Sequence, residues 1–99
     1  MISVKIHKSY RNVVAVCDSD LIGKTFEEGI KQIKIRESFF RDKELSAEET
    51  IALMKTESKE DSTFNIVGKQ SIKAAKQAGI ITEEGIGYIQ GIPYALVLL

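Results

Sequence analysis

The segment 65–79 holds the residues best suited to chemistry in this chain, and it reads NIVGKQSIKAAKQAG. An apolar stretch reaches Gly68 and then opens a helix-like pattern with Lys69 in its first turn. Backbone N–H groups at a helix start lack partners within the helix and carry partial positive charge, so they suit an anion. We therefore predict an anion-binding corner formed by Asn65, Gly68 and Lys69, with Lys24 from a glycine-bracketed loop as a second contact.

The predicted helix also carries a row of lysines, Lys69, Lys73 and Lys76, at helical spacing. Such a row suits phosphate contacts along RNA, but a charged stripe is also what any solvated helix face shows. The formal net charge is 0, which argues against a general binder of nucleic acids or membrane surfaces. We include Lys73 with Lys69 among the candidate RNA-binding residues.

Two fragments imitate the end of a phosphate-binding P-loop, namely Gly23-Lys24-Thr25 and Gly68-Lys69. A P-loop needs another glycine five positions earlier, so that its backbone N–H groups can surround the phosphates. Those positions hold Asp18 and Thr63, and the Asp18 carboxylate would repel phosphate. We reject nucleotide hydrolysis at both places.

The sequence contains few histidine and cysteine residues that could act as metal ligands or catalytic groups. His7 and Cys17 are the only histidine and cysteine, so the chain lacks the four ligands of a structural zinc site. We expect no metal, no cofactor and no catalytic residue, and we place an enzyme third among the functional hypotheses. Cys17 ends an apolar stretch, and we expect it to be a small buried hydrophobe. His7 is expected to be exposed on the polar face of its strand.

The first part of the chain favours strands. Residues 2–7 alternate apolar and polar side chains, which is typical of a half-buried strand. Residues 13–17 predict a second strand and an N-terminal hairpin, and residues 30–36 predict a third. We expect residues 21–29 to be irregular. Residues 37–44 remain ambiguous, with Phe39 and Phe40 expected to fill the core.

Helices follow in the middle of the chain. Ser46 and Glu49 form a capping box that begins a helix, which we expect to fray by Glu57. A second helix is expected over residues 68–78, followed by a final strand with Pro93 at its start or on an edge. Residues 1–99 are therefore predicted to form a single α+β domain, with a mainly antiparallel sheet and two helices packed on one face.

The sequence also bears on location. The apolar end, residues 92–99, is too short to span a bilayer, and no secretory signal pattern opens the chain. A lone cysteine is typical of a reducing compartment. We expect a cytoplasmic protein without a membrane partner.

Four segments carry a resemblance to a known family: VAVCD at 14–18, LIGKTFEEG at 21–29, NIVG at 65–68 and GIPYA at 91–95. In this order they resemble a small archaeal family catalogued as domain of unknown function 424. The family has no established activity. The resemblance implies an archaeal cytoplasmic protein, for which an association with translation is an expectation.

Two functional hypotheses follow. The first is a non-catalytic binding module that contacts RNA or a ribonucleoprotein in translation through Lys24, Asn65, Gly68, Lys69 and Lys73. The alternative is a protein-interaction subunit, a homodimer or hetero-oligomer without nucleic-acid contact, that pairs through its sheet edge or its apolar C-terminus. A basic surface continuous across Lys24 and Lys69 would favour RNA. An exposed apolar strand on a two-fold axis would favour the subunit.

Overall fold

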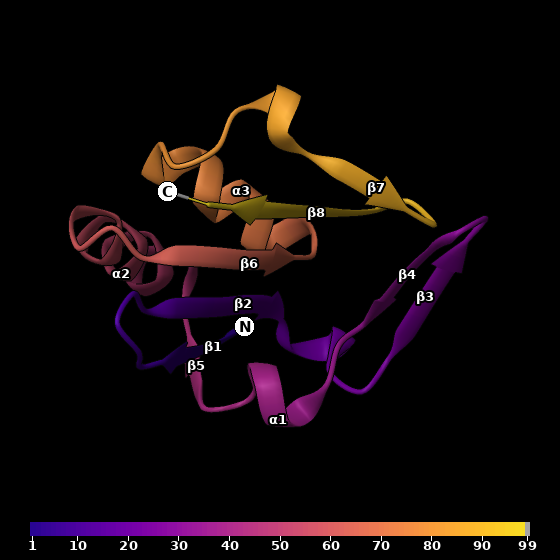
Figure 1. Ribbon diagram of the computed structural model, residues 1–99, viewed down its shortest axis with the longest axis horizontal. Helices are drawn as coiled ribbons and strands as arrows, with labels where there is room; N and C mark the ends of the chain where they lie inside the picture. Colours follow the sequence, from indigo (N-terminus) through magenta and orange to yellow (C-terminus); the bar gives the residue numbers. More distant parts are fainter. Residues whose placement is uncertain (99) are drawn as a thin grey trace.

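The computed structural model describes residues 1–98 as one domain built on a six-stranded sheet, whose arrangement is shown in Figure 1. The elements are, in chain order, β1 (Ile2–His7), β2 (Val13–Asp18), η1 (Ser19–Leu21), β3 (Thr25–Glu28), β4 (Lys31–Lys34), α1 (Glu37–Phe40), β5 (Lys43–Leu45), α2 (Ala47–Lys59), β6 (Thr63–Val67), α3 (Lys69–Ala78), η2 (Glu83–Gly85), β7 (Gly87–Ile89) and β8 (Ile92–Val97). None of the helices over residues 1–98 is long and apolar enough to cross a membrane.

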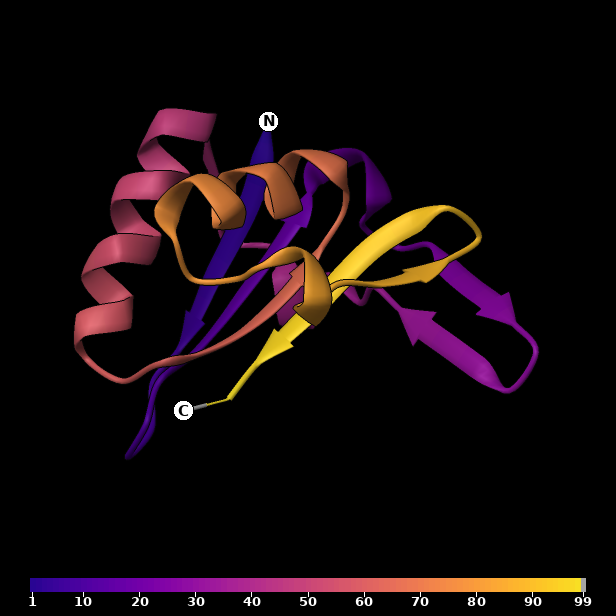
Figure 2. The same ribbon diagram turned by 90° about the horizontal axis from the view of Figure 1, so that it is seen from above.

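The main sheet has the strand order β5-β1-β2-β6-β8-β7. Strands β2 and β6 run parallel, whereas the other neighbouring pairs run antiparallel. Helices α2 and α3 lie together on one face of this sheet (Figure 2). The single turn of α1 packs through Phe40 against the other face. The predicted α+β class, the mainly antiparallel sheet and the placement of two helices on one face are confirmed.

Strand alternation divides the core between the two faces. In β2, Val14 and Val16 point toward α2 and α3, where they pack with Phe64 and Met54. The intervening side chains point to the opposite face and pack beneath α1 and the β3–β4 hairpin, in a second cluster of Ala15, Cys17, Leu21, Ile35, Phe40 and Val67. The two faces of the sheet therefore have different surroundings, which decides where each candidate site residue lies.

Local signals position both long helices as predicted. The Ser46 hydroxyl accepts a hydrogen bond from the Glu49 N–H, and the Glu49 carboxylate accepts one from the Ser46 N–H, so the capping box is confirmed. Donation from the Ser46 backbone lowers the pKa of the Glu49 carboxyl group. Helix α2 continues to Lys59, two residues beyond the expected fraying point. Gly79 ends α3 in the left-handed conformation.

The segment expected to be irregular is the main error of the fold prediction. Residues 25–28 form β3, which pairs with β4 in a separate hairpin that projects from the body of the domain (Figures 1 and 2). Gly29, with φ of +63°, takes the left-handed turn that folds one strand back on the other. The largely exposed β3, in which two of the four residues are glutamates, lacks the apolar alternation that marks a strand. Strand β5 is short and also largely exposed.

Candidate functional site

The start of α3 is occupied by a carboxylate of the protein itself. The side chain of Asp18 accepts hydrogen bonds from the Gln70 N–H at 3.1 Å and from the Ser71 N–H at 2.9 Å. The Ser71 hydroxyl adds a third bond at 2.8 Å. The Gly68 N–H donates to the Pro93 carbonyl at 2.8 Å. Asp18 is only 6% exposed, so this anion is sealed inside the fold.

The predicted corner for an external anion must therefore be corrected. Its geometry depended on free N–H groups at the helix start, and those of Gly68, Gln70 and Ser71 are already bonded within the protein. The cause is the parallel pairing of β2 with β6, in which Cys17 lies opposite Val67. The C-terminal ends of these two strands therefore lie side by side, which places Asp18, the last residue of β2, next to the start of α3.

Close packing at this point explains why residue 68 is glycine. A Cβ atom on Gly68 would lie 2.4 Å from Cγ of Asp18, and the φ of +113° disfavours other residues. The glycine therefore permits the Asp18 carboxylate to reach the helix. Its role at this place is structural.

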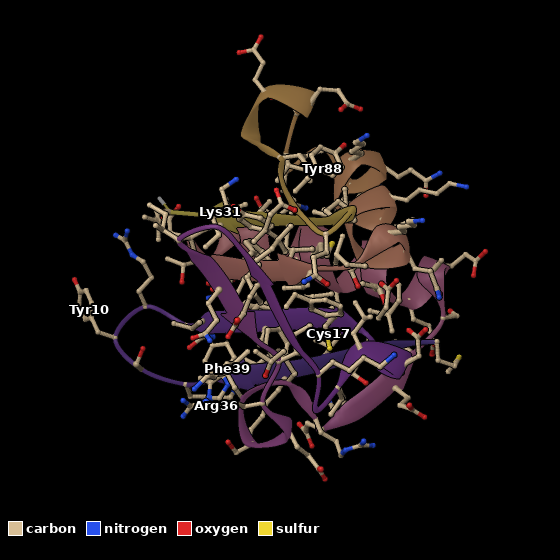
Figure 3. All side chains as sticks on the ribbon, turned by 90° about the vertical axis from the view of Figure 1, so that its right-hand side faces the viewer. Tyr10, Cys17, Lys31, Arg36, Phe39 and Tyr88 are labelled. Atoms are coloured by element: carbon tan, nitrogen blue, oxygen red, sulfur yellow. The ribbon has the colours of Figure 1, made fainter. Side chains whose placement is uncertain are left out.

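Lys69 and Lys73 lie together on the exposed face of α3. They line a depression of about 340 Å³ whose other walls are Ile72, Lys76, Tyr88, Gly91 and Pro93. The Lys76 ammonium is paired with the Glu83 carboxylate across the depression's rim. The Tyr88 side chain is 51% exposed and lies beside α3 in Figure 3. Lysines and an accessible aromatic ring thus share one surface, which we call the α3 face.

The remaining predicted site residues lie elsewhere. Asn65 is on β6, but strand alternation directs its side chain to the sheet face opposite α3, where it lines a different hollow. Lys24 is exposed at the base of the projecting hairpin, where its backbone bonds to Leu21 and Ile35, and it lines neither hollow. The structure brings Lys69 and Lys73 together and separates both from Asn65.

A nucleophilic pair of His7 and Cys17 does not form. Cys17 is fully buried, as predicted, and burial, with a smaller contribution from the Asp18 charge, raises the pKa of its thiol to about 12. At neutral pH the thiol is protonated and unreactive. His7 lies at the other end of the hairpin, opposite Val13. It is half-buried, contrary to expectation, because its ring stacks on Phe39 at 4.5 Å.

Residues 1–98 contain no group of three or more His, Cys, Asp or Glu side chains arranged to hold an ion.

A six-stranded mixed sheet, two helices on one face and a projecting hairpin define this protein as a compact single α+β domain. Similarity over residues 7–99 shows that the chain belongs to the family described as "Protein of unknown function (DUF424)". The fold also matches the crystal structure of an uncharacterized conserved protein from Methanopyrus kandleri. That match has a TM-score of 0.86 and 23% identity, and it covers 98% of this chain and 91% of the other. No curated protein matches the chain.

Proposed function

We propose that this protein is a non-catalytic binding module that contacts RNA, alone or in a ribonucleoprotein, through the α3 face. The observation that carries the proposal is the shared depression in which Lys69 and Lys73 lie beside the half-exposed ring of Tyr88. Single-stranded RNA is bound by this combination, since lysines contact the phosphates and aromatic rings stack on bases.

The charges of the α3 face support this assignment. Residues 63–79 contain three lysines and no acidic residue. Within residues 1–98, Lys69 and Lys73 form no ion pair, whereas Lys76 is held by Glu83. The first two ammonium groups are therefore free to replace counterions on neighbouring phosphates.

The shape of the face suits a stacked base. Tyr88 lies on the short edge strand β7, directly opposite Pro93 of β8. The adjoining Gly91 has open space where a side chain would begin, so a base can approach the ring without meeting a bulky neighbour. Base–aromatic stacking contributes about 1–3 kcal/mol per base in such sites.

The test measures binding of a fluorescent single-stranded RNA by polarization over a series of salt concentrations. Replacing both Lys69 and Lys73 by alanine should reduce the salt slope by about 1.4, because each phosphate contact to a single strand contributes about 0.7. Tyr88→Ala should weaken binding at least about fivefold, as expected for the loss of one stacked base.

The chain offers matched controls. Lys55 and Lys59 are exposed on α2 at the same spacing as Lys69 and Lys73, and their double alanine variant should bind RNA like the wild type. Tyr10 points into solvent at the tip of the β1–β2 hairpin (Figure 3), so Tyr10→Ala controls for Tyr88→Ala. Equal losses in the control variants, or no binding by the wild type at low salt, would contradict the proposal.

One observation favours the protein-interaction subunit as a second candidate. Strand β7 pairs with residues 92–94 of β8 only, so the outer edge of residues 95–97 has no partner strand among the described residues. Leu96 and Leu98 are 57% and 69% exposed at this edge, which carries no charge to block pairing with another strand. A homodimer would join two such edges.

Light scattering measures the molar mass in solution. If the chain is a homodimer, the wild type should have twice the mass of one chain at micromolar concentration, and Leu96→Lys should have the mass of a single chain. A monomeric wild type would rule out the homodimer.

A further inference from the structure

A second hollow, of about 290 Å³, lies on the sheet face opposite the long helices. It is bounded by β4 and α1 on one side and by β6 and β8 on the other. Its walls are mainly apolar, with Ile33, Phe39, Phe40 and Leu96 among them, and its polar groups come from Asn65, Lys34 and the hydroxyl of Tyr94. We call it the Asn65 hollow.

Asn65 is an unusual residue for this position. It lies in the interior strand β6, directly between Ala15 of β2 and Leu96 of β8, although asparagine is disfavoured in strands. Its side-chain amide has two N–H donors and an acceptor oxygen. None of these groups bonds to another side chain or to the backbone within residues 1–98. An apolar residue would fit the strand better, so the amide is available for a ligand.

The walls of the hollow are held in place before any ligand arrives. The Phe39 ring stacks on His7 at 4.5 Å and meets Phe40 edge-on at 5.1 Å. The Tyr94 ring lies over Gly87 of the neighbouring strand, where a Cβ atom would come within 2.6 Å of Cζ. This ring therefore leans toward β7, away from Asn65, and leaves the amide accessible.

We propose that the Asn65 hollow binds one unpaired nucleobase, whose edge is read by the Asn65 amide. Aromatic and aliphatic walls suit the faces of a planar ring, and an amide pairs with adjacent donor and acceptor groups on a base edge. The exposed Lys34 lies at the rim, where its charge complements the nucleotide's phosphate. This inference rests on the proposed function and extends it, because phosphate contacts and stacking of the kind proposed for the α3 face depend little on base identity.

The hollow can be tested separately from the α3 face. Pro93 lines the depression on α3, whereas its neighbour Tyr94 lines the Asn65 hollow, so the two sites lie on opposite faces of β8. A mononucleotide is small enough to probe the hollow alone. The double variant of Lys69 and Lys73 should therefore bind mononucleotides like the wild type.

The experiment titrates ¹⁵N-labelled protein with each of the four nucleoside 5′-monophosphates and follows the amide resonances by NMR. We expect at least one nucleotide at millimolar concentration to shift the Asn65 side-chain NH₂ signals and the backbone signals of Phe39 and Leu96. The dissociation constants should differ among the four bases. Asn65→Leu keeps the approximate size of the side chain and removes the amide. This variant should retain the fold and bind the preferred nucleotide at least tenfold more weakly.

Three outcomes would overturn the inference. The first is that no nucleotide shifts the Asn65 signals, and the second is that ribose 5-phosphate does so equally well. The third is that p-cresol shifts these signals while nucleotides do not, which would assign the hollow to a protein side chain. A different result is that nucleotides bind in the Asn65 hollow while the double alanine variant of Lys69 and Lys73 keeps the RNA affinity of the wild type. That result would support the Asn65 hollow as a nucleobase site and would contradict the α3 face as the RNA-binding surface.

Discussion

Replacing Gly68 by alanine is expected to destabilise the protein by about 2–5 kcal/mol, the sum of overpacking and of left-handed backbone strain. The new Cβ atom would lie 2.4 Å from Cγ of Asp18 and 2.5 Å from its Oδ1. The Asp18 side chain cannot retreat without releasing its bonds to Gln70 and Ser71. Urea unfolding followed by circular dichroism measures the change.

A double-mutant cycle separates the clash from the backbone strain. Asp18→Ala alone should cost about 1–3 kcal/mol, because it leaves buried donors at the start of α3 without an acceptor. In that background, Gly68→Ala should cost only about 1–2 kcal/mol, the strain of the left-handed backbone. Gly23→Ala is the matched control, since its φ is +87° and nothing lies within 4 Å of the new Cβ atom. Strictly additive costs in the cycle would show that Asp18 and Gly68 do not interact.

Phe64→Ala should cost about 3–5 kcal/mol of unfolding free energy, the usual range for removing a buried aromatic side chain. Phe64 is fully buried in β6, between Val14 of β2 and Val97 of β8, on the face covered by α2 and α3. Phe26→Ala is the control, because that ring is only partly buried on the projecting hairpin. A similar loss at both positions would mean that the hairpin is as important to the core as the central strand.

The sequence predicts this fold where its signals are local. The capping box at Ser46, the glycine after Ala78 and the alternation in residues 2–7 each act within a few residues, and each marks an element that the structure contains. Strands β3 and β5 are not predicted from the sequence, because they are short and mostly exposed, and their side chains show no alternation between an apolar and a polar face.

The candidate site is predicted less well, for a geometrical reason. Helical spacing alone predicts that Lys69 and Lys73 share one side of a helix, and they do lie together on the α3 face. Asn65 is only three residues from Gly68, yet the period-two alternation of β6 directs its side chain to the other face of the sheet. The contact between Asp18 and Ser71 spans 53 positions, so it becomes visible only once β2 and β6 are known to be parallel neighbours.

The two long helices differ in where their N-terminal caps come from. Helix α2 is capped by a residue adjoining it, whereas α3 takes its capping carboxylate from the end of β2. In a nascent or unfolded chain, α2 can begin to form from local sequence, but α3 gains its cap only after a long loop has closed. We therefore expect the C-terminal half to gain its stability cooperatively with the N-terminal hairpin, with pairing of β2 and β6 preceding the capping of α3.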